Sequence, residues 1–292
     1  MSGAVPCPPV PFVVGAGRSG TTLLRLMLDS HPGLAIPAET HFIPRLAQRF
    51  ATRPVTGASF SDALAAERRW GDFGIDAGEL SRRLGPTREL ELGEALRGFY
   101  RAYAERQGKD RWGDKTPGYC QCMTLVRELL PEARFIHLIR DGRDVALASS
   151  ERNGRDPAEN AAVWRRKVAA ARSQRRRLTG YHEVRFEDLV GAPEATLREL
   201  CGVLELDWEP EMLNYHRRAP ERLRELGDLR GRRIGGQSAT AELRRSFYEL
   251  NTKPLRDAEI GRGRRELAPP DLAAVEREAG DLLTELGYGL GR

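Results

Sequence analysis

A short apolar strand that leads into a glycine-rich loop is the feature that most constrains this fold. Pro11–Val14 is apolar and partly β-branched, which is typical of a buried strand. The loop Gly15–Gly20 follows, and Thr21–Ser30 then carries leucines and a methionine at helical spacing. In such a strand–loop–helix unit, backbone N–H groups and the helix dipole favour an anion at the helix N-terminus. We therefore expect a phosphate-like group to bind here.

The remaining chain alternates between strand and helix patterns. Further strands are expected at 34–36, 134–139 and 183–186, and helices at 142–150, 158–177, 193–204 and 271–286. This alternation predicts an α/β fold of three layers with a central parallel sheet, similar to P-loop nucleotide kinases. We expect one domain over 1–292, with a helical insert at about 41–110 that lacks strong strand signals. A C-terminal lid and helix are expected at about 217–292, beginning with an arginine- and glycine-rich loop at 217–236.

Composition narrows the classes of function. The 292 residues contain 47 Lys and Arg against 42 Asp and Glu, a net charge of +5. This excess suits a small anionic ligand but is too slight and too dispersed to predict nucleic-acid binding. The four cysteines lack metal-ligand spacing. The N-terminus has no signal-peptide pattern, and no apolar stretch approaches the roughly 20 residues of a membrane span, so a cytoplasmic location is expected.

The glycine loop has more than one interpretation. Gly15, Gly17 and Gly20 match a dinucleotide fingerprint, and Glu39 follows about 20 residues later, where a ribose-binding acid would stand. An NAD(P)-dependent oxidoreductase is therefore one hypothesis. The spacing of Gly15 and Gly20 also suits a nucleotide-hydrolysing P-loop, although Thr21 stands where that loop needs a lysine.

A third interpretation accounts for more of the loop. Arg18-Ser19-Gly20-Thr21-Thr22 resembles the 5′-phosphosulfate loop of sulfotransferases that use 3′-phosphoadenosine 5′-phosphosulfate (PAPS). The resemblance implies that backbone donors from Gly17 to Thr21 hold the 5′-phosphate. In this interpretation Arg18 supplies charge, and Thr21 and Thr22 add hydroxyl groups.

The resemblance continues into the next segment. Leu28–Pro32 followed by Ala38–Arg45 resembles the tyrosylprotein sulfotransferase branch, in which a glutamate at the place of Glu39 is the catalytic base. In that branch an arginine two residues later helps around the acceptor, whereas this chain has His41, which is the second candidate base. Asp114–Pro117 resembles the lysine loop of the same branch. Lys115 would then lie near the bridging oxygen of the donor.

Two later segments resemble the parts that hold the rest of the nucleotide. Ile136–Asp144 resembles the 3′-phosphate motif, which assigns Arg140 to that phosphate. The family has a serine eight residues later, but position 148 is alanine, so Ser149 is the candidate replacement. Phe186 stands where an aromatic ring contacts adenine.

The C-terminal part carries the last resemblance. Thr252–Pro254 and the following Arg262 and Arg264 resemble the segment that closes over the 3′-phosphate, which makes Lys253 and Arg262 candidate contacts.

Taken together, the resemblance implies an enzyme that transfers a sulfuryl group from PAPS to an acceptor hydroxyl by in-line displacement. Glu39 would take the acceptor proton, and Lys115 with Arg18 would stabilise the leaving phosphate oxygen, without a metal. The product nucleotide would be adenosine 3′,5′-bisphosphate. The acceptor is open between a small molecule and a peptide hydroxyl, and a homodimer is one option for the assembly. An oxidoreductase and a non-catalytic nucleotide-binding protein remain the alternatives.

Overall fold

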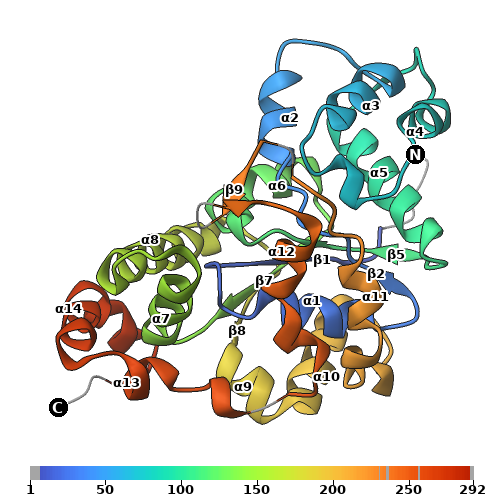
Figure 1. Ribbon diagram of the computed structural model, residues 1–292. Helices are drawn as coiled ribbons and strands as arrows, with labels where there is room; N and C mark the ends of the chain where they lie inside the picture. The colour runs from blue at the N-terminus through green and yellow to red at the C-terminus, as the bar shows by residue number, and fades with distance from the viewer. Residues whose placement is uncertain (1–6, 230, 235–236, 256, 290–292) are drawn as a thin grey trace.

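The computed structural model describes residues 7–229, 231–234, 237–255 and 257–289, and it is built around one parallel sheet (Figure 1). The strand order is β6 (Asp114–Lys115), β1 (Val10–Gly15), β7 (Ala133–Ile139) and β8 (Tyr181–Arg185). All three pairings are parallel, with Val13 opposite Ile136 and Lys115. The carboxyl ends of the four strands therefore share one edge, where ligands bind in open α/β sheets.

Helices cover both faces of the sheet, which confirms the predicted three-layer α/β class. The side chains of β1 alternate: Phe12 belongs to one core cluster and Val13 to the other, as the two-residue period of a strand requires. On the Val13 side lie α1 (Thr21–Asp29), α9 (Phe186–Gly191) and α10 (Pro193–Leu204). On the Phe12 side lie α5 (Leu92–Arg106), α6 (Met123–Leu129) and α8 (Pro157–Gln174).

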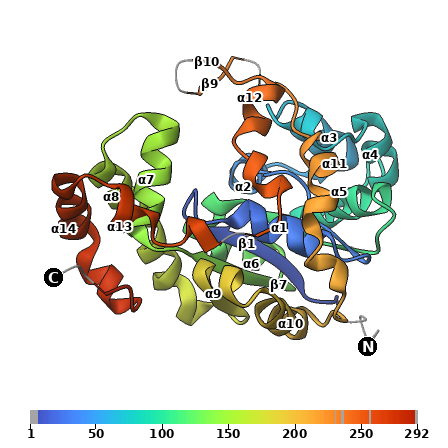
Figure 2. The same ribbon diagram turned by 60° about the horizontal axis from the view of Figure 1, so that its bottom comes forward.

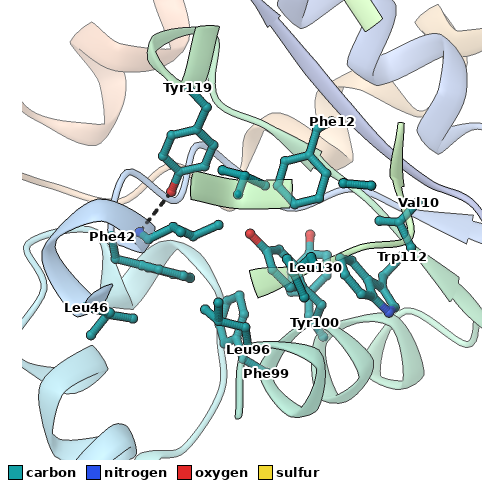
Figure 3. Packing of buried hydrophobic residues seen from close by; sticks show 14 of the residues in the cluster. Val10, Phe12, Phe42, Leu46, Leu96, Phe99, Tyr100, Trp112, Tyr119 and Leu130 are labelled. Carbon is teal, nitrogen blue, oxygen red and sulfur yellow. Dashed lines mark hydrogen bonds between the residues drawn. The ribbon is translucent and has the colours of Figure 1, made fainter. Parts of the chain in front are cut away.

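The core beneath the Phe12 face is aromatic (Figure 3). The rings of Tyr100 and Trp112 are stacked at 4.4 Å between centroids, and Phe12 meets both rings edge-on. The Tyr119 hydroxyl accepts a hydrogen bond from the backbone N–H of Ile43 at 3.1 Å. The hydrogen bond from Ile43 holds the segment after Glu39 against this core, which helps to fix the position of Glu39.

The insert between the first two sheet strands is mainly helical, but it also contains strands. Its helices are α2 (Ile43–Arg49), α3 (Gly57–Ala65), η1 (Trp70–Asp72), α4 (Ala77–Leu84) and α5. An antiparallel pair, β3 (Val55–Thr56) with β4 (Glu89–Leu90), joins its two halves. No strong signal in the sequence predicted this strand pair. A two-residue strand is too short to show an alternating pattern.

The predicted strand at 34–36 forms, but outside the main sheet. β2 (Leu34–Ala35) pairs in parallel with β5 (Arg111–Trp112), immediately before β6. Lys109 supports this arrangement, because its buried ammonium group donates a 2.8 Å hydrogen bond to the carbonyl of Leu34. The pair thus brings the chain entering Glu39 and the chain entering Lys115 together.

The C-terminal part packs around the same sheet edge (Figure 2). Helices α13 (Arg262–Glu266) and α14 (Pro269–Glu285) lie against α7 (Gly142–Asn153) and α8. The short elements between α6 and α13 are η3 (Arg175–Arg177), η4 (Pro210–Met212), η5 (Tyr215–Arg217), α11 (Ala219–Leu223), β9 (Arg233–Ile234), β10 (Gln237–Ser238), α12 (Ala241–Ser246), η6 (Glu249–Thr252) and η7 (Asp257–Glu259). A further 3₁₀ helix, η2 (Pro117–Gln121), follows β6. No described helix combines the length and apolarity needed to cross a membrane.

The segment predicted as a loop at 217–236 is partly an anchored helix, which corrects that prediction. Arg222 on α11 is 3% exposed, and its guanidinium donates to both carboxylate oxygens of Asp29, at 2.7 and 3.1 Å. A third hydrogen bond joins it to the Tyr103 hydroxyl at 2.6 Å. Because breaking a buried ion pair leaves an uncompensated charge, these contacts hold α11 in place. Gly235 and Gly236 lie outside the described residues.

Candidate functional site

The glycine loop is held in shape by close packing at two of its glycines. A Cβ on Gly15 would lie 2.6 Å from the carbonyl oxygen of Leu138, and one on Gly20 would lie 2.4 Å from the Phe186 ring. Gly20 also has a φ of 91°, which favours glycine, and Arg18 adopts a φ of 68°. A non-glycine residue in this region is strained, and such strain clusters at ligand sites. The loop is therefore built to bring its backbone close to a neighbour or a ligand.

Buried donors without partners surround this loop. Among the described residues, Arg18 Nε, Ser19 Oγ and Arg140 Nε are buried and have no hydrogen-bond partner. Burial and the neighbouring Arg152 lower the pKa of Arg18. Helix α1 begins at Gly20 without a side-chain cap, so its first N–H groups are also available. Unsatisfied buried donors are rare, and here they fit a bound anion.

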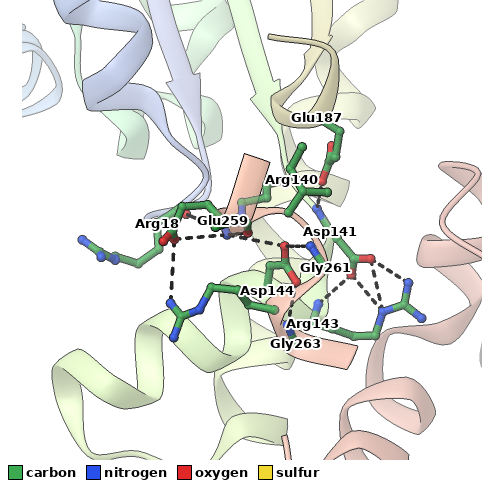
Figure 4. Close-up of polar contacts among 12 residues, drawn as sticks. Arg18, Arg140, Asp141, Arg143, Asp144, Glu187, Glu259, Gly261 and Gly263 are labelled. Atoms are coloured by element: carbon green, nitrogen blue, oxygen red, sulfur yellow. Dashed lines mark hydrogen bonds and ion pairs between the residues drawn. The ribbon is translucent and has the colours of Figure 1, made fainter. Parts of the chain in front are cut away.

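Arg140 lies where the ends of β1 and β7 meet (Figure 4). Its guanidinium donates to the carbonyl oxygen of Arg18 at 3.4 Å and approaches Asp144 Oδ2 at 3.4 Å. The carbonyl of Glu259 accepts a further hydrogen bond, and the Phe186 ring lies 4.5 Å from the guanidinium carbon. The two predicted phosphate-binding segments are therefore neighbours, as one nucleotide that spans both would require.

A cavity of about 270 Å³ opens beside these two strand ends. We call it the aromatic cavity, because Phe186, Tyr215, Phe247 and Tyr248 line it. Its wall also includes seven further residues proposed from the sequence, namely Gly17, Arg18, Gly20, Thr21, Thr22, Glu39 and Lys253. Aromatic faces beside a loop with anion-binding donors suit a nucleotide, because the base can stack while the phosphates meet the loop.

Glu39 lies at the mouth of this cavity between three basic side chains. Lys115 Nζ donates to its Oε1 at 2.8 Å, His41 Nε2 lies 2.8 Å from its Oε2, and Arg69 is 3.8 Å from Oε2. Burial by itself would raise the pKa of Glu39, but Lys115, His41 and Arg69 outweigh it and hold that pKa well below the usual range. Glu39 is thus a charged carboxylate positioned at fixed distances from a lysine.

The positions of Glu39 and Lys115 depend on a buried polar cluster beneath them. Asp114 Oδ2 accepts hydrogen bonds from the hydroxyls of Thr40, at 2.8 Å, and Tyr100, at 2.9 Å. The backbone N–H of Thr40 donates to Thr116 Oγ1 at 3.0 Å. Burial raises the pKa of Asp114. Thr40 follows Glu39, and Asp114 and Thr116 flank Lys115, so the cluster holds these two site residues close together.

A second cavity, of about 600 Å³, is lined by both Glu39 and Lys115. We call it the basic cavity, since the described side chains lining it include nine arginines and lysines and a single acid, Glu39. Gly17, Thr22 and Tyr248 line both cavities. Glu39 also lines both cavities and pairs with Lys115 of the basic cavity, so a group could pass beside this pair from a ligand in one space to a ligand in the other.

Comparison with known proteins assigns the chain to a family. The model of the sulfotransferase family matches residues 9–210, which contain the glycine loop, Glu39, Lys115 and Arg140. The chain belongs to the sulfotransferase family.

Curated relatives of this sulfotransferase include animal enzymes. Protein-tyrosine sulfotransferase 1 of Danio rerio is 28% identical over 217 residues, which cover 71% of this chain and 56% of that protein. Protein-tyrosine sulfotransferase A of Caenorhabditis elegans is 26% identical over 220 residues, covering 71% and 52%. The chain spans about half the length of these curated relatives.

Two bacterial sulfotransferase domains share the fold. The sulfotransferase domain of the Synechococcus PCC 7002 olefin synthase superimposes with a TM-score of 0.63 at 22% identity, covering 99% of this chain and 98% of that one. The sulfotransferase domain from the curacin biosynthetic pathway gives 0.64 at 20% identity, covering 98% and 100%. These structural matches confirm the predicted α/β fold. The family match over residues 9–210 confirms the predicted family and favours the sulfotransferase interpretation of the loop over the oxidoreductase one.

Four of the predicted contacts line neither cavity, namely Ser19, Arg140, Ser149 and Arg262. Arg140 nevertheless adjoins the aromatic cavity, since it contacts Phe186 and Glu259 of its wall. Arg262 forms ion pairs with Glu151 and Glu266, at 2.6 and 2.8 Å, and lines neither cavity. Ser149, on α7, is half-buried and also lines neither. Sequence reasoning missed Arg152, which lines both cavities and stacks on Phe247 at 4.3 Å. The sequence could have indicated Arg152, because it lies about three helical turns after Arg140, near the end of the helix that follows β7.

Proposed function

We propose that this sulfotransferase binds PAPS in the aromatic cavity and transfers its sulfuryl group to a hydroxyl bound in the basic cavity. The observation that carries the proposal is the contact of Arg140 with the glycine loop, 3.4 Å from the carbonyl of Arg18, beside a cavity with an aromatic wall. The family uses PAPS as its donor, and this geometry offers separate groups to the two ends of one adenosine bisphosphate.

Different residues would hold the different parts of the donor nucleotide. The loop N–H groups from Gly17 to Thr21 and the side chain of Arg18 hold the 5′-phosphate. Arg140 holds the 3′-phosphate, for which its unpartnered Nε is available. Phe186 lies against the guanidinium of Arg140 and presents its ring to the cavity wall, where adenine can stack. Ser149 and Arg262 would reach the nucleotide only if their side chains moved from the present positions.

Chemistry takes place where the two cavities meet. The acceptor oxygen attacks sulfur, the bond between sulfur and the phosphate oxygen breaks, and Glu39 accepts the acceptor proton. Lys115 stabilises the negative charge that develops on the leaving oxygen. His41, 2.8 Å from the carboxylate, orients Glu39 rather than replacing it as base. Sulfuryl transfer depends on alignment of the reacting groups and on charge stabilisation. The fixed Glu39–Lys115 pair would provide a large part of both.

The Glu39→Gln variant tests this assignment. Gln keeps the shape of the side chain but cannot accept the proton, so we expect turnover with a phenolic or alcohol acceptor to fall by about 100-fold or more. Affinity for adenosine 3′,5′-bisphosphate, measured by calorimetry, should stay near that of the wild type. Equal loss of nucleotide affinity and turnover would assign Glu39 a structural role. Nucleotide binding without transfer by the wild-type protein would favour a non-catalytic binding protein.

The names of the curated relatives suggest one class of acceptor. The relatives from Danio rerio and Caenorhabditis elegans are named as protein-tyrosine sulfotransferases. A phenolic hydroxyl is therefore a reasonable first acceptor to assay. The walls of the basic cavity give independent information about what else the acceptor must carry.

A further inference from the structure

The basic cavity contains more positive charge than its own acids neutralise. Three of its basic residues are paired: Arg25 with Glu225 at 3.1 Å, Lys115 with Glu39, and Arg244 with Asp72. By contrast, Arg155, Lys167 and Arg232 form no ion pair with any residue in the part of the chain that the structure describes. The cavity thus holds a set of positive charges that only solvent or a ligand can neutralise.

These charges come from separate elements of the fold. Arg155 precedes α8, and Lys167 lies more than two turns after the start of that helix. Arg232 precedes β9, over 60 residues further along the chain. Arg69, from η1 of the insert, also faces the cavity and has only long contacts, 3.8 Å to Glu39 and 3.9 Å to Asp72. On an ordinary solvated helix face, charged residues repeat along a single element. Here the basic side chains come from several separate elements and line one cavity, which is typical of a binding site.

The neighbours of Lys167 on α8 show the contrast. Arg165 points to α14, where it pairs with Glu278 at 2.9 Å, and Arg166 is exposed and does not line the cavity. Only Lys167 of this run lines the cavity. Arg166 therefore provides a matched control, with the same charge on the same helix.

We propose that the acceptor is a small hydroxyl compound that also carries a phosphate or sulfate ester group. Resting on the proposed function, this assignment places the hydroxyl at Glu39 and the anionic ester group against Arg155, Lys167 and Arg232. Planar guanidinium groups bind tetrahedral oxyanions with two parallel hydrogen bonds, which favours such esters over neutral alcohols. The volume of about 600 Å³ lies in the range of small-molecule sites, and charges on several sides favour a compact ligand over an extended peptide.

The test measures anion binding while the donor site is occupied. The full chain is saturated with adenosine 3′,5′-bisphosphate, and pyrophosphate is then titrated by calorimetry at about 0.15 M ionic strength, where the Debye length is about 8 Å. We expect a single pyrophosphate to bind, and we expect its Kd to rise about tenfold in Lys167→Glu and in Arg232→Glu. The Arg166→Glu control changes net charge equally and should leave that Kd within about twofold, since distant exposed charges are screened.

Each alternative outcome has a distinct meaning. No pyrophosphate binding to the saturated protein would overturn the assignment, and so would an equal effect of Arg166→Glu and Lys167→Glu. If a glutamate-rich peptide bound as tightly as pyrophosphate, with the same sensitivity to Lys167→Glu, the small-ester assignment would be overturned in favour of an acidic peptide acceptor. If the bisphosphate itself failed to bind, the proposed function would fail first. The milder Lys167→Gln and Arg232→Gln variants, with melting temperatures near that of the wild type, would separate charge loss from misfolding.

Discussion

Replacing Arg140 by alanine should reduce affinity for the 3′-phosphate selectively. Arg140 is 5% exposed, and its Nε has no partner, so a phosphate placed there would meet a desolvated cation. A hydrogen bond to a charged group contributes about 1.5–3 kcal/mol, which corresponds to roughly 10- to 150-fold in Kd. We therefore expect adenosine 3′,5′-bisphosphate to bind Arg140→Ala within this range more weakly than it binds the wild type.

The comparison with AMP separates recognition from general damage. AMP lacks the 3′-phosphate, so its Kd, measured by the same calorimetric titration, should change less than about threefold in Arg140→Ala, within the spread of surface effects. Removing Arg140 leaves Asp144 with two backbone donors, Gly261 N–H at 2.9 Å and Gly263 N–H at 2.7 Å. The Asp144 carboxylate therefore keeps hydrogen-bond partners in the variant, and these two hydrogen bonds still hold the segment after Glu259 in place. Equal weakening of both nucleotides would refute the assignment of Arg140 to the 3′-phosphate.

Two further predictions concern stability. Gly20→Ala should lower the free energy of unfolding by about 1–3 kcal/mol, because its Cβ would meet the Phe186 ring and its φ of 91° disfavours alanine, whereas Gly17→Ala, with nothing within 4 Å, should change it little; equal denaturant midpoints for the two variants would contradict this account of the loop. Burial lowers the pKa of His137 to about 3 from 6.5, so the unfolded chain takes up this proton first as the pH falls. The free energy of unfolding should therefore decrease between pH 6.5 and 3, by up to about 1.4 kcal/mol per pH unit from this residue, and His137→Phe should show a shallower slope in denaturant titrations at several pH values.

The strand ends that the residue pattern itself predicted are those of the two long strands, β1 and β7. The glycine loop and Arg140 each follow a buried strand of six or seven residues, and parallel strands bring such ends to one edge. The roles of Arg140 and Lys115 were both assigned by resemblance, but only Arg140 follows a strand that the pattern predicted, because β6 is two residues long and shows no alternation. Asp114, the neighbour of Lys115, carries the cluster that positions Glu39, yet nothing local distinguishes it from a surface acid.

The residues that the sequence did not predict depend on contacts between distant segments. Arg152 and Arg232 reach the cavities from elements 80 positions apart in the chain. Arg262, by contrast, was expected at the nucleotide, but Glu151 and Glu266 lie within reach of its side chain and pair with it. In a chain with 47 basic and 42 acidic residues, pattern alone cannot decide which arginines find an acid and which stay free for a ligand.

The Glu39–Lys115 pair sets a condition that any mechanism at this site must meet. A carboxylate whose pKa is held well below its usual range accepts a proton poorly, and the lysine is a main cause of that low pKa. In the proposed reaction Lys115 turns towards the leaving oxygen of the donor, and the pKa of Glu39 rises because it loses this 2.8 Å contact. Donor binding would then make Glu39 a better base only when there is a sulfuryl group to transfer. The acceptor hydroxyl is thus activated last, which limits the chance that Glu39 is protonated before the donor is in place.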